Sequence, residues 1–119
     1  MTKSERELRQ YRLMHDRLTG FLAGTLGIGD AISDLEGLLA ALEEISEDWR
    51  RAFQAEWGTL EVFYAIALDH GDPVLPDASV PELKQSAENM LAMVDGEIGT
   101  AASQLVTHNA RSAAVIKRS

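Results

Sequence analysis

The segment from Ser46 to Gly71 constrains the fold of this chain more than any other stretch. It contains five of the seven aromatic residues in the sequence. Its large apolar side chains recur at steps of three and four residues, which places them on one face of an α-helix. These residues are Trp49, Phe53, Trp57, Leu60, Tyr64, Ala67 and Leu68. Ser46 is a favourable N-cap, and Gly71 followed by Pro73 is typical of a helix end.

Three other segments show the same helical spacing of apolar residues. They predict a first helix over residues 5–23, a second over 28–44 and a fourth from about residue 80 to Thr107. Ser4 with Glu7, and Ser79 with Glu82, have the spacing of capping boxes, and Gly24 suits the position after a helix. The expected core residues of these helices are Leu8, Tyr11, Met14, Leu18, Phe21, Leu22, Ile28, Ala31, Ile32, Leu35, Leu38, Leu39, Leu42, Leu83, Ala87, Met90, Leu91, Val94, Ile98, Ala101 and Leu105.

Short connections between successive helices favour antiparallel neighbours. We therefore expect an all-α fold, an antiparallel four-helix bundle with up-down-up-down topology and a C-terminal extension. The length is that of one domain, which we place at residues 1–107. Residues 108–119 form a basic tail, either disordered or a helical extension.

The charge of the chain is uneven. The formal net charge is −8, yet residues 27–82 alone hold thirteen acidic residues against Arg50 and Arg51. Such acidity argues against nucleic acid as a direct ligand, because phosphate binding needs a basic face. It can attract a basic protein partner, or it can serve solubility alone.

The sequence carries no motif for a familiar catalytic or metal site. It has no Cys, and the residues three before His15, His70 and His108 are not carboxylates, so the Glu-x-x-His pattern of di-iron bundles is absent. The glycines of residues 24–29 lack the strand and the Lys-Ser/Thr of a phosphate loop, and they suit a helix–helix turn. We therefore expect no enzyme activity, no catalytic residue, no cofactor and no metal.

Apolar runs are too short to cross a membrane, and the first ten residues lack the apolar stretch of a secretory signal. A cytoplasmic protein without membrane contact is expected. Glu56 lies in the row of the aromatic stripe, where a lone carboxylate is costly to bury. We expect it to pair with Arg12 or Arg17 of the first helix, with a catalytic carboxylate as the alternative.

Two stretches resemble a known family. Residues 21–26, Phe-Leu-Ala-Gly-Thr-Leu, lead into Ile32, Asp34, Leu35 and Glu36. Residues 57–61 and 64–69 carry Trp-Gly-x-Leu-Glu and Tyr-Ala-x-Ala-Leu-Asp. Together they are similar to the colicin D immunity-protein-like family of small helical bacterial immunity proteins. The chain departs from that pattern in its turn at residues 27–29, and its tail beyond Thr107 has no counterpart.

The resemblance implies a four-helix bundle that binds a cognate bacterial toxin, often a nuclease, and covers its basic active site. The partner is then a basic toxin domain, and the chain itself is a monomer or a homodimer. Six carboxylates on the second helix and the following turn are the expected contacts to Lys or Arg of such a partner. They are Asp30, Asp34, Glu43, Glu44, Glu47 and Asp48.

Two other roles stay open. A structural or self-associating helical module would use small residues as a dimer face, namely Gly37, Ala40, Ala41, Ala101 and Ala102. A small-molecule sensor or an enzyme would place Glu56, Glu61 and Tyr64 around a pocket between helices.

Overall fold

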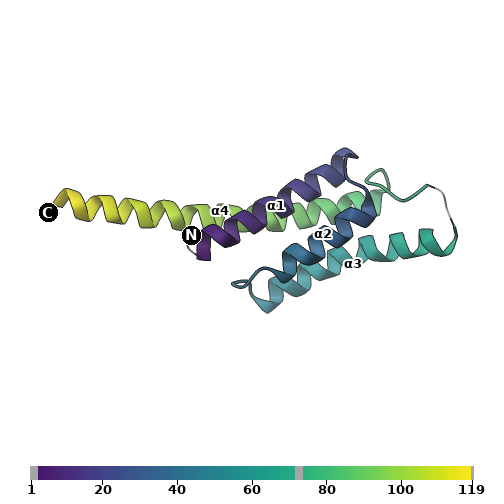
Figure 1. Ribbon diagram of the computed structural model, residues 1–119, viewed down its shortest axis with the longest axis horizontal. Coiled ribbons are helices and arrows are strands. Elements are labelled where there is room, and N and C mark those ends of the chain that lie inside the picture. The colour runs from purple at the N-terminus through teal and green to yellow at the C-terminus, as the bar shows by residue number, and fades with distance from the viewer. Residues whose placement is uncertain (1–2, 72–73, 119) are drawn as a thin grey trace.

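The computed structural model describes residues 3–71 and 74–118, with side chains at residues 5–71 and 74–103. Four helices form the regular structure of these residues: α1 Lys3–Ala23, α2 Ile28–Ala40, α3 Glu47–Asp69 and α4 Pro81–Arg118. Each helix runs opposite to the one before it (Figure 1). The prediction of an all-α, up-down-up-down four-helix bundle is confirmed.

The four helices form a ring in which each one packs against two others. α1 packs against α2 and α4, and α3 packs against the same two helices. Within the described residues the diagonal pairs, α1 with α3 and α2 with α4, do not come into backbone proximity. The α1–α4 interface is the most extensive, so the first and last helices close the bundle (Figure 1).

The core lies where the apolar stripes of the four helices meet. α1 contributes a full stripe from Tyr11 to Phe21, and α3 contributes Phe53 and Leu60, both without solvent exposure. The Trp49 ring stacks on Phe53 at a centroid distance of 5.3 Å, and Tyr11 meets Trp49 edge-on at 6.0 Å. The aromatic segment therefore packs into the bundle as its spacing predicted.

The expected apolar residues of α1, α2 and α4 are buried or half-buried throughout residues 8–101. Leu105 lies outside the residues with described side chains. In α3, Leu68 is an exception, because 55% of it is exposed. Gly29 near the start of α2 lies beside Tyr64, so the last turn of α3 extends past α2 and has less to pack against.

Three of the predicted helix ends are correct. The Ser46 hydroxyl accepts a hydrogen bond from the Trp49 N–H at 3.1 Å, which caps α3. Gly24 and Gly71 both have positive φ, 81° and 63°, the left-handed conformation that glycine adopts at low cost. After Gly24, the N–H groups of Thr25 and Leu26 both donate to the carbonyl of Gly20.

Both predicted capping boxes are wrong. α1 begins at Lys3, so Ser4 lies inside the helix, and the Glu7 carboxylate binds the N–H of Glu43 instead. At the other site the Ser79 hydroxyl and N–H both donate to Asp77 Oδ1, so Ser79 is engaged in the loop before α4. The side chains predicted to cap these helices therefore bind other groups: Glu7 binds the distant Glu43, and Ser79 binds Asp77 in the loop.

α2 ends at Ala40, four residues before the predicted end at Glu44. Side chains of α1 and α3 bind the backbone groups that a further turn of α2 would have paired. The Glu43 N–H donates to Glu7 of α1, and the Arg50 guanidinium of α3 donates to the carbonyls of Leu39 and Leu42. A helix end needs partners for its free carbonyls, and here side chains supply them.

α4 is much longer than its partner α1, at 38 residues against 21. Its last turns extend past the start of α1 and beyond the other helices, in yellow in Figure 1. This extension sets the longest dimension of the molecule, 69 Å against 26 and 22 Å across. The backbone of residues 108–118, the predicted tail, belongs to α4, and Ser119 lies outside the described residues.

Candidate functional site

The candidate site is the acidic turn, which we define as Glu43, Glu44, Glu47 and Asp48. These four carboxylates lie in the connection from α2 to α3 and in the first turn of α3, and all are exposed. The connection lies at the end of the bundle where α1 begins (Figure 1). Glu47 and Asp48 sit where the positive end of the α3 dipole favours negative charge.

Contacts from α1 and α3, and the N-cap of α3, hold the acidic turn in place. Glu7 Oε1 of α1 accepts a hydrogen bond from the Glu43 N–H at 3.0 Å. Arg50 Nη1 and Nη2 donate to the carbonyls of Leu39 and Leu42 at 3.4 and 3.3 Å. Ser46 caps α3 on the other side. The fold itself therefore fixes the turn, and a preorganised surface of this kind carries a low ordering cost for binding.

A basic residue of the chain itself partly balances the negative charge at this end of the bundle. Arg6 Nη1 lies 3.5 Å from Glu43 Oε1, and both side chains are about half exposed. An ion pair with that exposure contributes little to stability and can exchange for an external partner. Within the described residues, Glu47 and Asp48 make no ion pair.

The pKa of Tyr11 is affected by the negative charge at this end of the bundle. Burial raises the pKa of its phenol well above the ordinary value, and the charges of Glu97, Glu7 and Glu44 raise the pKa further. Deprotonation would place another negative charge among three carboxylates. The phenol consequently stays neutral through the physiological pH range.

Glu7 is a functional candidate that the sequence patterns did not predict. It is only 5% exposed, and its second oxygen, Oε2, is buried with no hydrogen-bond partner among the described residues. The signal was present in the sequence, because Glu7 lies four residues before Tyr11 and shares the core-facing stripe of α1. A carboxylate in such a stripe needs a buried partner, and the backbone of Glu43 is one.

Asp30 and Asp34 are not part of the acidic turn. Asp30 is exposed in the first turn of α2, at the opposite end of that helix. Asp34 Oδ2 forms an ion pair with Arg17 Nε at 3.0 Å. The structure thus brings together four of the six predicted contact residues and separates the other two along α2.

The prediction that Glu56 pairs with Arg12 or Arg17 is wrong. Its Oε2 accepts a hydrogen bond from Asn89 Nδ2 of α4 at 3.2 Å, while Arg17 pairs with Asp34. The reason is the ring order, since α1 and α3 lie diagonally and Glu56 faces α4. Of the other expected pocket residues, Glu61 is exposed, and Tyr64 packs its ring end against the backbone of Gly29.

The small residues suggested for a dimer face are only partly on the surface. Gly37, Ala40 and Ala41 are exposed at the end of α2. Ala101 is buried in the bundle and Ala102 is half-buried, so Ala101 does not belong to an open face of α4.

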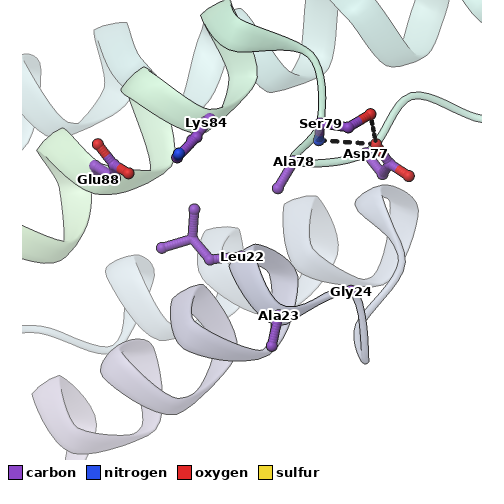
Figure 2. Close-up of a pocket in the computed structure, with 8 residues that line it drawn as sticks. All are labelled: Leu22, Ala23, Gly24, Asp77, Ala78, Ser79, Lys84 and Glu88. Carbon is purple, nitrogen blue, oxygen red and sulfur yellow. Dashed lines mark hydrogen bonds between the residues drawn. The ribbon is translucent and has the colours of Figure 1, made fainter.

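A shallow hollow of about 420 Å³ lies at the opposite end, between the end of α1 and the loop before α4. Figure 2 shows its lining, with Leu22 from α1 beneath Lys84 and Glu88 of α4, and the turn of Asp77 and Ser79 at the rim. Hydrogen bonds from the Ser79 hydroxyl and then from its N–H hold the pKa of Asp77 below its usual range. These contacts account for Asp77 as a loop-forming residue.

Within the described residues, no group of three or more His, Asp or Glu side chains could hold a metal ion. None of the described helices combines the length and the apolar character of a membrane span. No protein-family model, curated protein or solved structure matches the chain. The assignment of a function consequently depends on the site itself.

Proposed function

We propose that this chain is an acidic helical binding protein whose acidic turn binds a basic protein domain. In the specific form of the proposal it is an immunity-type inhibitor that covers the basic active site of a toxin nuclease. The observation that carries the proposal is the acidic turn: four exposed carboxylates on a connection braced by α1 and α3. Its role is binding, with no reaction of its own.

The electrostatics of the chain support this role. Residues 27–82 hold thirteen acidic residues and two basic ones, and one of these two, Arg50, donates to carbonyls of α2. The field of such a surface accelerates encounter with a basic partner and disfavours acidic ones. Rim charges alone add little affinity, so part of the acidic turn becomes desolvated in the complex.

The proposal ranks the predicted contact residues. Glu47 and Asp48 are exposed and form no internal ion pair with a described residue, so they contribute most. Glu43 first has to leave Arg6, and Asp34 is held by Arg17. Asp30 lies too far along α2 to share a small interface with the turn.

The test is affinity purification from the native host, followed by calorimetry with the purified partner. The double variant Glu47→Lys with Asp48→Lys should weaken binding at least about tenfold, and binding should weaken in about 0.5 M salt. Glu82→Lys with Glu88→Lys is the matched control, because it changes the net charge equally at the other end of the bundle.

For the inhibitor form, the partner's nuclease activity should fall in proportion to the amount of added chain. Recovery of no basic partner would overturn the proposal. So would equal losses of affinity in the two double variants, because the acidic turn would then have no special part in binding.

A further inference from the structure

The outer face of α3 carries a stripe of small and apolar residues between two opposite charges. We call it the α3 seam and define it as Arg51, Ala55, Gly58, Val62, Ala65 and Asp69. The steps along the stripe are four, three, four, three and four residues, the heptad spacing of a helix that pairs with another helix. The seam lies opposite Phe53 and Leu60, which face the core.

Large apolar side chains are exposed along and beside the seam. Val62 is 57% exposed and Ile66 is 51% exposed. All the large apolar residues with high exposure among the described side chains fall between residues 62 and 75, and they are Val62, Ile66, Leu68, Val74 and Leu75. Of these five, Val62 lies on the seam and Ile66 one turn further along α3, and adjacent exposed apolar residues are typical of an interaction surface.

Gly58 in the seam is a second sign that another helix packs there. It lies in the middle of α3, where glycine costs about 0.5–1 kcal/mol relative to alanine. A Cβ at this position would meet nothing within 4 Å, so no described part of the chain requires the glycine. Gly37, Gly96 and Gly99 have similar open space, but none has an exposed large apolar residue one turn away, as Gly58 has in Val62.

The seam is complementary to itself when two copies of α3 run antiparallel. Reading one copy forwards and the other backwards sets Gly58 opposite the second copy's Val62, Ala55 opposite Ala65, and Arg51 opposite Asp69. The large side chain then meets the residue with no side chain, and the charge pair closes both ends. Each position recurs twice about a two-fold axis, as an isologous interface requires.

The charges of the seam are available for such a pair. Arg51 and Asp69 are both exposed, and the side chain of neither forms a hydrogen bond or ion pair with a described residue. Arg51 and Arg50 are the basic residues of the acidic region 27–82, and Arg50 is used inside the fold. In this region, Arg51 is therefore the basic residue that is available to a carboxylate of a second copy of the chain.

We propose that the α3 seam binds a second copy of this chain in an antiparallel, two-fold symmetric dimer. The occupant is α3 of the second copy, with Val62 packed over Gly58 and Arg51 paired with Asp69. The proposal does not depend on the function of the acidic turn. In this dimer the two acidic turns lie at opposite ends of the paired helices and stay open to other partners.

Sedimentation equilibrium of the full chain over roughly 10 to 500 μM tests the dimer. The mass should approach twice the 13.0 kDa of the chain as concentration rises. Gly58→Leu should weaken dimerisation at least about tenfold, because the added side chain blocks the close approach of Val62. Gly37→Leu on α2 is the matched control, since its Cβ also meets nothing within 4 Å, and it should leave the mass unchanged.

A charge swap tests the orientation. Arg51→Asp and Asp69→Arg should each weaken the dimer, and the double variant should restore it, because the pair is then reversed on both copies. Circular dichroism confirms that each variant is folded. A chain that is monomeric at the highest concentration overturns the proposal, and so does a dimer that tolerates Gly58→Leu. A double variant no tighter than the single ones overturns the antiparallel pairing.

Discussion

The Glu7 side chain has two opposing effects on the stability of the fold. One oxygen receives the Glu43 N–H and so fixes the acidic turn, while the other oxygen is buried without a hydrogen-bond partner among the described residues. The charges of Glu44 and Glu97 act on the same region, as their effect on the pKa of Tyr11 indicates. The hydrogen bond stabilises the fold, and the buried charge opposes it.

Substitutions at Glu7 should separate these two effects. Glu7→Ala removes the acceptor of the Glu43 N–H and should lower the free energy of unfolding by about 1–3 kcal/mol. Glu7→Gln keeps a carbonyl oxygen for that bond and removes the charge, but its amide NH2 takes the buried place of Oε2, which has no hydrogen-bond partner among the described residues. It should therefore be more stable than Glu7→Ala. Urea unfolding at pH 7 measures both.

The control for Glu7 is Glu36→Ala, an exposed position on α2 whose change should stay within about 0.5 kcal/mol. If Glu7→Gln is as unstable as Glu7→Ala, the hydrogen bond from the Glu43 N–H is not what the Glu7 side chain contributes to stability.

Single residues also mark the limit of what the sequence could predict. The N-cap Ser46 and the terminal glycines Gly24 and Gly71 follow from chemistry within a few residues, and they are confirmed. Glu7 and Ser79 match the same kind of local rule, yet each binds elsewhere. A capping box competes with other hydrogen-bond partners. For Ser79 the competitor is the nearby Asp77 carboxylate, whereas for Glu7 it is the Glu43 N–H, a distant donor that only the folded chain brings near.

At the scale of the element, α2 contains two glycines in different surroundings. A Cβ at Gly29 would lie 2.9 Å from Tyr64 Oη, too close without a shift of the ring. A Cβ at Gly37 would meet nothing within 4 Å. The first glycine permits close contact between α2 and α3, and the second makes no such contact within the described chain.

Alanine at each position should therefore have a different effect. Gly37→Ala should raise the free energy of unfolding by about 0.5–1 kcal/mol, since alanine favours the helix. Gly29→Ala should be less stable than Gly37→Ala by about 1 kcal/mol or more, because it displaces Tyr64. Thermal unfolding of the two variants side by side gives the comparison, and equal stabilisation would contradict the close packing of Tyr64.

The apolar periodicity predicted the helices well but not where each one stops. The buried faces of α1, α2 and α4 agree with their spacing, because burial of an apolar stripe is what holds a helix in a bundle. α2 nevertheless stops at Ala40 although Leu42 is also buried. A chain can continue to bury apolar residues after its helix has ended, when side chains such as Arg50 satisfy the free carbonyls.

At the scale of the molecule, the ring order decided which charges meet. The sequence supported the presence of four antiparallel helices, but the pairing of Glu56 required knowing which helices are neighbours. Because α3 lies diagonally to α1, Glu56 meets Asn89 of α4 and Arg17 meets Asp34 of α2. The same limit applies to the acidic residues, of which four gather at the turn and two lie along α2.

The position of the core predicts the effect of shortening the chain. Ala101 is the last buried residue among the described side chains, and α4 continues to Arg118 beyond the start of α1 (Figure 1). A chain that stops after Thr107 should unfold within about 4 °C of the full chain, because the packed core is intact. Calorimetry measures this midpoint, and a fall of more than about 10 °C would place part of the stabilising contacts in the extension.

The position of Trp49 has a practical consequence. Its indole is half-buried against Phe53 and Tyr11, and it directly follows Asp48 of the acidic turn. Trp57 is two turns further along α3 and donates its indole N–H to the Ile32 carbonyl at 2.9 Å. The protein thus contains an intrinsic fluorophore beside its candidate site and a second, half-buried one held by a hydrogen bond to α2 as a reference, so occupancy of the turn can be followed by light emission without any attached dye.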